Sequence, residues 1–524
     1  MFPAFLHPFG AARDERAYKQ AVESAAFCGL FGLERVMPMA LIDVSHLTFG
    51  YDGSFEDVFE DVSFQIDTSW RLGFTGRNGR GKTTFMKLLM GLYPYQGTIT
   101  APVQFEYFPL EVPDGSLTTL EAAQQLNPGM EQWRFERELG LLLVDEGVLW
   151  RPFDTLSGGE RTKVLLTLLF LRDHRFLLID EPTNHLDMRA REQVAAYLRR
   201  KSGFILVSHD RAFLDACVDH VLSINKTGIE VVSCDFSTFM HNKALREQYE
   251  LGENERLKRD IGRLAKAART TAGWSDAVEK TKKSAADSGY VGHKSAKMMK
   301  RAKNAETRKL RAVEEKKGLL RDVETVEPLT MHPLEFRQSR LAEAADLSIC
   351  FDGREVTRGV RFTVRGGERI ALSGPNGCGK SSILKLIAGE EIPHGGTLRV
   401  ASGLVISYVP QDMRFLEGSL CDYARACGVD ATLLLTTLRT LDFSRAQFEK
   451  DMRDFSAGQK KKVLLARSLC EEAHLFLWDE PLNYIDLYSR MQIESLIQRK
   501  RPTMLFVEHD RAFVDAVATQ RIEL

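Results

Sequence analysis

The feature that most constrains this chain is an internal repeat, in which four sequence motifs recur in the same order. The first copies read GRNGRGKTT, LSGGERTK, FLLIDEPTNHLD and LVSHDRAFLDA, and the second copies read GPNGCGKSS, FSAGQKKK, LFLWDEPLNYID and LFVEHDRAFVDA. The spacings also agree, since 75 residues separate Lys82 from Ser157 and 76 separate Lys380 from Ser456. A unit of roughly 200 residues is too long for a solenoid repeat, so the chain contains a duplicated domain.

The repeat divides the 524 residues into four expected segments. Residues 39–240 and 327–524 hold the two copies, and residues 241–326 form a charged linker between them. Residues 1–38 carry none of the motifs, and we expect an extension outside the folded domains, either a loose tail or a segment upstream of a start at Met37 or Met39. Hydrophobic residues make up 44% of the chain, which excludes a mostly disordered protein.

Each copy contains the pattern GxxxxGK[ST] between a strand-like run and a helix-like run. In this P-loop, backbone N–H groups surround phosphates, the helix N-terminus favours the anion, and the lysine reaches the β- and γ-phosphates. The hydroxyl of Thr83 or Ser381 is suited to Mg²⁺, so we expect ATP and Mg²⁺ as ligands. The predicted nucleotide-binding residues are Gly76, Asn78, Gly79, Gly81, Lys82, Thr83 and Thr84 in the first copy and Gly374, Asn376, Gly377, Gly379, Lys380, Ser381 and Ser382 in the second.

Two apolar runs, Phe176–Ile179 and Leu475–Trp478, end in Asp-Glu and read as central parallel strands buried on both faces. Their carboxylates then emerge at the edge of the sheet where ligands bind in such folds. We expect the aspartate to hold Mg²⁺, the glutamate to polarise the attacking water, and a histidine after a later strand to contact the γ-phosphate. In the two copies these residues are Asp180 and Asp479, Glu181 and Glu480, and His209 and His509.

The linker carries an excess of basic residues. From Arg256 to Arg311 there are 17 Lys and Arg against 5 Asp and Glu, a net charge of +12, although the whole chain has a net charge of −1. Apolar spacings of three and four predict two antiparallel helices of about 40 Å each, joined by a tip at 272–292. A solvated spacer would mix charge signs, whereas this excess fits an RNA backbone, with bases met at the tip. The candidate RNA-binding residues are Trp274, Lys280, Lys282, Lys283, Tyr290, His293, Lys294, Lys297, Lys300, Arg301 and Lys303.

With the LSGGE and FSAGQ motifs, the sequence resembles the ATP-binding cassette (ABC) ATPases over about 400 of its 524 residues. The resemblance implies an α/β protein with two tandem ABC-type P-loop ATPase domains, joined here by a long α-helical hairpin. It further implies that the signature motif of each domain closes the ATP site of the other. Ser456 and Gly458 would close the first site, and the second would be closed by Ser157, Gly158 and Gly159.

The resemblance assigns three further positions. Tyr51 and Phe351 match the position that stacks on adenine, although a core aromatic would fit the sequence as well. Gln411 in YVPQD matches a glutamine that contacts Mg²⁺, whereas the first copy reads YFPLE and places Leu110 there. Leucine cannot bind a metal, so either the first site couples ATP differently or Glu111 takes this place.

Tandem ABC domains with a charged helical hairpin resemble the ABC-F family of ribosome-associated ATPases. GWSDAVEKTK, GYVGHKSAKMMKRAK and EPLNYID resemble its Lsa-type branch, which protects ribosomes against lincosamides, pleuromutilins and streptogramin A. The resemblance implies a cytoplasmic ATPase that binds the E site of the 70S ribosome. Its hairpin would reach the P-site tRNA and the 23S rRNA of the peptidyl-transferase centre, and ATP hydrolysis would drive release.

Three alternatives remain open from the sequence. A housekeeping ABC-F translation factor shares the chemistry, but only about 45 residues follow Leu110 before the first signature motif, which leaves no room for its extra helical arm. A transporter ATPase would need membrane domains, and this chain has no run of about 18 apolar residues. A DNA-repair ATPase would carry zinc cysteines or a far longer coiled coil. We therefore expect no DNA or membrane partner and a monomer with an intramolecular ABC sandwich.

Overall fold

The protein is described by a computed structural model covering residues 40–51, 57–77, 79–172, 174–184, 186–225, 228–282, 304, 307–308, 311, 329–351 and 354–524. The expected extension at 1–38 lies outside these residues. The chain forms two compact units, of which one contains Met1–Phe236 and Pro328–Leu524 and the other contains Ser237–Glu327. Both copies of the repeat therefore belong to the first unit.

The first copy contains a six-stranded sheet and a three-stranded sheet. The large sheet has the order β5-β6-β7-β3-β8-β9 and is parallel except for the β8–β9 pair. The small antiparallel sheet has the order β2-β1-β4. The strands are β1 (Leu41–Phe49), β2 (Phe59–Asp67), β3 (Arg71–Thr75), β4 (Gln96–Thr100), β5 (Gln104–Phe108), β6 (Arg175–Asp180), β7 (Phe204–Val207), β8 (His220–Asn225) and β9 (Gly228–Ser233).

Helices pack around these sheets and carry the P-loop and signature motifs. They are α2 (Lys82–Leu89), α3 (Thr119–Leu126), α4 (Gln132–Leu141), α5 (Gly158–Phe170), α6 (Met188–Leu198) and α7 (Arg211–Cys217), with the 3-10 turns η1 (Glu146–Trp150) and η2 (Phe153–Thr155). The run Phe176–Ile179 in β6 is fully buried, which confirms the predicted central strand. The core of this copy joins residues of both sheets to Phe85 and Met86 of α2.

The second copy repeats this arrangement. Its parallel sheet has the order β15-β17-β18-β13-β19, and an antiparallel sheet has the order β12-β11-β14. The strands are β11 (Arg340–Phe351), β12 (Arg354–Arg365), β13 (Arg369–Ser373), β14 (His394–Val400), β15 (Ile406–Val409), β17 (Leu475–Asp479), β18 (Met504–Val507) and β19 (Gln520–Glu523), with a short parallel pair of β10 (His332–Pro333) and β16 (Glu472–Ala473).

The helices of the second copy follow the same order as those of the first. They are α10 (Lys380–Ala388), α11 (Leu420–Ala426), α12 (Ala431–Thr440), α13 (Ala457–Cys470), α14 (Leu487–Lys500) and α15 (Arg511–Val517), with η3 (Arg445–Gln447) and η4 (Met452–Asp454). The central strand β17 is buried, and its Trp478 donates an indole hydrogen bond to Ser468 Oγ at 2.9 Å. The predicted α/β class and tandem arrangement are confirmed.

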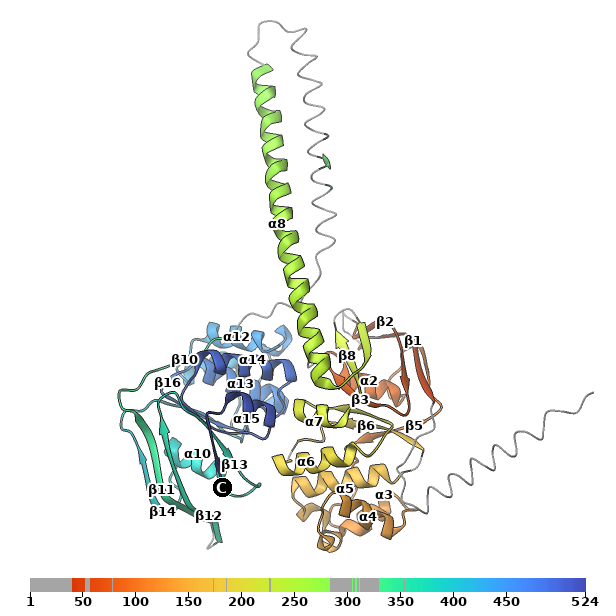
Figure 1. Cartoon of the computed structure of the whole chain (residues 1–524), viewed down its shortest axis with the longest axis vertical. Coiled ribbons are helices and arrows are strands. Elements are labelled where there is room, and N and C mark those ends of the chain that lie inside the picture. The colour runs from red at the N-terminus through yellow and green to blue at the C-terminus, as the bar shows by residue number, and fades with distance from the viewer. Residues whose placement is uncertain are drawn as a thin grey trace, which may run out of the picture. The chain divides into compact units, whose positions relative to one another are not determined.

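Most of the described residues of the second unit belong to the long helix α8 (Phe236–Lys282), which Figure 1 shows as continuous. Its 47 residues correspond to about 70 Å, which is longer than the predicted arm of about 40 Å. The expected tip at 272–292 is wrong for its first part, because the helix continues to Lys282. A single Gly273 costs only about 1 kcal/mol of helix propensity, and the Ala, Glu and Lys residues near it favour a helix.

Candidate active site

The two P-loops have matching geometry. Lys82 and Lys380 are the first residues of α2 and α10, and each follows a glycine at positive φ, Gly81 at 94° and Gly379 at 90°. A Cβ at Gly81 would collide with Val58, so both the backbone conformation and the space require glycine. The loops can therefore bring backbone N–H groups close to phosphates.

Each P-loop lysine lies across its own loop. Lys82 Nζ donates to the carbonyls of Gly76 and Arg77 at 2.7 and 3.2 Å. Lys380 Nζ donates to those of Gly374 and Pro375 at 2.9 and 2.8 Å. Two ammonium groups held in this way at helix N-termini are suited to the phosphates of a nucleotide.

The residues expected to hold Mg²⁺ lie beside the P-loops. Thr83 Oγ1 donates to Asp180 Oδ2 at 3.2 Å, at the end of β6. Both carboxylate oxygens of Asp479 are buried, and neither receives a hydrogen bond of good geometry from the described residues. Burial raises the pKa of Asp479 to about 6, and the nearby Ser381 hydroxyl acts in the opposite direction. A buried carboxylate beside a hydroxyl fits a divalent cation, so the donor set is compatible with Mg²⁺. Bound Mg²⁺ would neutralise charge on the phosphates.

A glutamate and a histidine lie together at each site. His209 Nε2 is 3.3 Å from Glu181 Oε1, and His509 Nε2 is 3.4 Å from Glu480 Oε1. Glu181 and Glu480 both have positive φ, at 50° and 46°. This conformation is uncommon outside glycine, and its occurrence at the same position of both copies marks a functional constraint that the sequence does not show.

The two glutamates differ electrostatically. Burial raises the pKa of Glu181 to about 8, and burial also lowers the pKa of His209 well below its usual value, so this pair is held largely uncharged. Burial also favours a higher pKa for Glu480. The interactions of its carboxylate with His509 and with nearby lysines outweigh burial, so the pKa of Glu480 is lowered. Gln411 and Asn483 also donate to Glu480 Oε2, at 2.9 and 2.6 Å.

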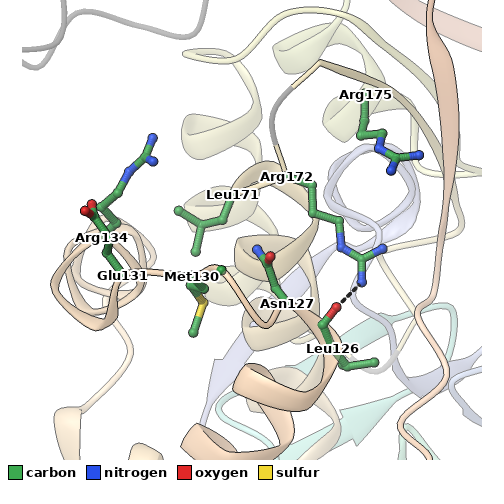
Figure 2. A pocket seen from close by; sticks show the side chains of 9 residues that line it. Leu126, Asn127, Met130, Glu131, Arg134, Leu171, Arg172 and Arg175 are labelled. Carbon is green, nitrogen blue, oxygen red and sulfur yellow. Dashed lines mark hydrogen bonds between the residues drawn. The ribbon is translucent and has the colours of Figure 1, made fainter.

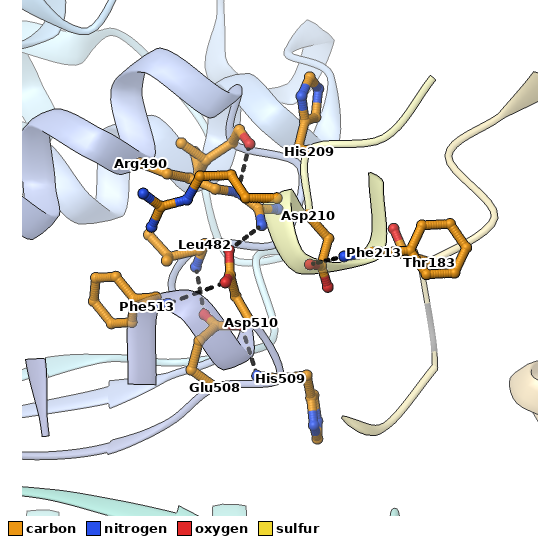
Figure 3. A network of polar contacts seen from close by, with 12 residues as sticks. Thr183, His209, Asp210, Phe213, Leu482, Arg490, Glu508, His509, Asp510 and Phe513 are labelled. Carbon is orange, nitrogen blue, oxygen red and sulfur yellow. Dashed lines mark hydrogen bonds and ion pairs between the residues drawn. The ribbon is translucent and has the colours of Figure 1, made fainter. Parts of the chain in front are cut away.

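A buried arginine anchors the aspartate that directly follows each histidine (Figure 3). Its Nη1 donates to an aspartate, at 2.8 Å in the first copy and 3.1 Å in the second. Its Nε donates to a carbonyl just before the helix that carries the arginine itself, at 3.1 and 2.9 Å. The residues involved are Arg191, Asp210 and Leu186 in the first copy and Arg490, Asp510 and Ile485 in the second.

One cavity joins residues from both copies. It has a volume of about 540 Å³ and contains the second P-loop together with Ser157 and Gly158 of the first copy. The lining residues of the second copy are Val356, Asn376, Gly377, Gly379, Lys380, Ser381, Ser382, Gln411, Glu480, Asn483 and His509. The structure therefore brings the first signature motif to the second P-loop. The assignment of Gly159 to this site, and of Ser456 and Gly458 to the first site, stays a prediction.

Comparison with known proteins agrees with this geometry. The model of the ABC transporter family matches residues 59–184 and 357–483. The chain is 28% identical over 483 residues to the ribosome protection protein VmlR of Bacillus subtilis, covering 90% of this chain and 85% of that protein. It is 27% identical to the ATP-binding protein Uup of Caulobacter vibrioides, covering 90% of this chain and 75% of that protein. The chain contains two tandem ABC ATPase domains.

The resemblance to the ABC-F family is confirmed by these relatives. The solved complex of the archaeal ribosomal stalk protein aP1 with the ribosome recycling factor aABCE1 shares the fold of this ABC ATPase, with a TM-score of 0.60 and 21% identity over 91% of this chain and 87% of that one. At that identity the likeness shows the fold alone. No helix within the described residues of the ABC ATPase is long and apolar enough to cross a membrane.

Sequence reasoning missed a tyrosine in the first site of this ABC ATPase. Tyr107 OH donates to Asp180 Oδ2 at 2.8 Å, whereas the hydroxyl of its counterpart Tyr408 is buried and has no partner among the described residues. The sequence contains a pattern that could have identified this tyrosine, because YFPLE and YVPQD both begin with tyrosine, on the strand next to the one that ends in Asp-Glu. Leu110 is half-buried and Glu111 is exposed.

The predicted adenine-stacking residue of the first site belongs to an aromatic cluster. Tyr51 is 45% exposed, its hydroxyl lies 2.7 Å from Thr84 Oγ1, and its ring meets Phe49 and Tyr93 edge-on at centroid distances of 5.1 and 5.9 Å. One part of the ring is thus held while another is open to a ligand. Phe351 ends β11, but its side chain lies outside the described residues.

A second cavity, of about 450 Å³, lies away from the P-loops and was not predicted (Figure 2). Arg134, Arg172 and Arg175 line it together with Glu131. Arg172 donates to the carbonyl of Leu126 at 2.6 Å, which holds the end of α3. This arginine therefore has a clear structural role.

Most candidate RNA-binding residues, and one P-loop residue, lie outside the described residues. Trp274, Lys280 and Lys282 belong to α8, although nothing is described of their side chains. The positions outside the described residues are Asn78, Lys283, Tyr290, His293, Lys294, Lys297, Lys300, Arg301 and Lys303. Their roles stay predictions.

Proposed function

We propose that this ATPase binds the 70S ribosome at the E site in its ATP-bound state, in the cytoplasm, and leaves after ATP hydrolysis. The observation that carries the proposal is α8, a helix of about 70 Å on a tandem ABC ATPase. A helix of this length can place residues far from the ATPase domains, and we infer that the linker reaches the P-site tRNA and the 23S rRNA.

The charge of the linker supports an RNA partner. In the described part of α8, Arg256, Arg259 and Arg263 have side chains 76–78% exposed, and each pairs with an acidic neighbour one helical turn away. This part therefore mixes charge signs like a solvated helix. Of the net charge of +12 between 256 and 311, residues 256–282 carry +5 and residues 283–311 carry +7, and we expect contact with phosphates on both parts.

We further propose that binding protects the ribosome against lincosamides, pleuromutilins and streptogramin A. The relative VmlR is a ribosome protection protein, and the sequence resembles the Lsa-type branch. A housekeeping translation factor is the second candidate. Between Leu110 and Ser157 the chain forms only α3, α4, η1 and η2, which favours the protection role because there is no added helical arm in this segment.

In the proposed reaction, Asp180 and Asp479 hold Mg²⁺ with Thr83 and Ser381. Glu480 would take a proton from the attacking water, and Glu181 would do the same once the positive charge of bound Mg²⁺ lowers its raised pKa. The paired His209 and His509 lie close enough to orient these carboxylates and to contact the γ-phosphate. Ser157 and Gly158 would present the N-terminus of α5 to the nucleotide at the second site.

Co-sedimentation tests the ribosome proposal. The double variant Glu181→Gln/Glu480→Gln, incubated with ATP, should pellet with 70S ribosomes because it retains ATP and stays bound. The matched control adds Lys294→Gln, Lys297→Gln and Lys300→Gln, which should weaken pelleting at low salt and make the remaining binding less steeply dependent on salt. A double variant that remains in the supernatant at low salt would refute ribosome binding.

A further inference from the structure

An ion pair connects the P-loop of the first copy to the second copy. Nη1 of Arg77 lies 2.8 and 3.0 Å from the two carboxylate oxygens of Asp442, and its guanidinium lies 5.7 Å from the ring centroid of Tyr488. The carbonyl of the same Arg77 accepts a hydrogen bond from Lys82 Nζ. One residue thus contacts the P-loop lysine through its backbone and the second copy through its side chain.

The turn that carries Asp442 is fixed to the signature helix of the second copy. Lys462 Nζ donates to the carbonyl of Leu441 at 2.5 Å and pairs with Asp486 at 3.0 Å. Both of these side chains are buried, with exposures of 5% and 0%. Lys462 belongs to α13, the helix that begins at the signature motif with Gly458 and that the ABC pattern assigns to the first ATP site.

The second site has neither partner of this pair. The position of Arg77 is occupied by Pro375 in the second P-loop, and the position of Asp442 is occupied by Leu143 in the first copy. The turns themselves match, since Asp442 and Leu143 have φ values of 61° and 53° after equivalent helices. Leu143 is 69% exposed. The fold therefore does not require the ion pair, and its presence is specific to the first site.

We propose that Arg77 is a positioning residue for the first ATP site, and that its pair with Asp442 aligns the first P-loop with the signature helix α13. The inference concerns ATP turnover and needs no ribosome, so it stands or falls separately from the proposed function. The first site lacks the family glutamine and has Leu110 instead, and the ion pair supplies a link between the copies that the second site does not have.

The test is a double-mutant cycle on ATP turnover by the purified full chain carrying Glu480→Gln, in which only the first site keeps its glutamate. Arg77→Gln and Asp442→Asn each remove one charge, and asparagine keeps the tolerance for positive φ. Each variant should lower kcat roughly five- to tenfold while the KM for ATP changes little, and the double variant should be no slower than either single variant. The exchanged pair Arg77→Asp/Asp442→Arg should recover part of the lost kcat.

The control is Glu192→Ala, which breaks an exposed pair between the same two copies. Glu192 and Arg511 lie 2.9 Å apart with side chains 58–59% exposed, so in the same Glu480→Gln chain kcat should stay within about twofold of the value without this substitution. Unchanged unfolding midpoints would show that the variants fold. Three results would each overturn the inference. They are a double variant whose loss of kcat equals the product of the two single losses, an unchanged kcat for Arg77→Gln, and no recovery of kcat in the exchanged pair.

Discussion

Glu181 and Glu480 share a backbone conformation that most side chains avoid, and each lies next to a histidine. A strained residue persists only where the surrounding structure holds it in place. Here the hydrogen bonds from the backbone N–H groups of Glu181 and Glu480 to the carbonyls of Val207 and Val507, at 2.9 and 3.0 Å, fix that position. The carboxylate is thereby aimed from the end of the central strand toward the P-loop.

If both glutamates accept a proton from water, their replacement should remove turnover without removing ATP binding. Glu181→Gln and Glu480→Gln should each lower ATP turnover, and the double variant should lose roughly 100-fold or more. The measurement is steady-state phosphate release, with binding of labelled ATP as the control. Full activity in the double variant would contradict the assignment.

Tyr107 provides a second residue-scale prediction, because only the first site uses this hydroxyl. Tyr107→Phe removes the hydrogen bond that orients Asp180, so the first site should need roughly tenfold more Mg²⁺ for half-maximal turnover. The assay uses the Glu480→Gln chain, in which only the first site keeps its glutamate.

The matched control is Tyr408→Phe in the Glu181→Gln chain. Its hydroxyl has no partner in the described part of the chain, so the Mg²⁺ dependence should change by less than about twofold. Equal effects of the two substitutions would contradict a role for Tyr107 at the metal site.

At the scale of elements, buried ion pairs hold the segments that carry the histidines. Arg490 and Asp510 have side chains only 8% and 1% exposed, so removal of the arginine leaves a buried charge without its partner. Arg490→Ala should lower the free energy of unfolding by about 3 kcal/mol, measured by urea denaturation. The exposed pair Arg361–Asp346 is the control, and Arg361→Ala should cost less than about 1 kcal/mol.

The elements also show which features could be predicted from sequence. The apolar run Phe176–Ile179 identified β6 because a strand buried on both faces needs only apolar side chains. The predicted end of the first linker helix is too early, because the stretch that begins at Gly273 has the composition of a loop, whereas the helix-forming residues on both sides of it continue α8 to Lys282. The contact of Arg77 with Asp442 could not be predicted, because it depends on how two distant loops meet.

The sequence motifs predict the chemistry of the two ATP sites, but they do not predict how the two sites differ. Lys82 and Asp180 lie where the P-loop and the Asp-Glu strand predict, since each is fixed by a short local pattern. Burial and the charge of Asp180 raise the pKa of Glu181, whereas His509 and the nearby lysines lower the pKa of Glu480 although burial acts against them. Such differences arise from three-dimensional surroundings, and two nearly identical motifs do not reveal them.

At the scale of the whole molecule, the protection role and the housekeeping role predict different phenotypes. Expression in a susceptible bacterium should raise the inhibitory concentrations of a lincosamide and a pleuromutilin, because the linker would reach the site where these drugs bind. The Glu181→Gln/Glu480→Gln chain is the control and should not protect, since it cannot complete the ATP cycle. Unchanged inhibition by every drug tested would favour the housekeeping role.

The uninterrupted course of α8 has a mechanical consequence. Phe236 lies at the boundary of the two units, and the helix continues from it to Lys282 without a break. A rigid rod converts a small rotation at its base into a large displacement at its end. For a length of about 70 Å, a rotation of about 5° at Phe236 moves the far end by about 6 Å. Small changes in backbone angle next to the ATPase domains would thus become movements as large as a side chain.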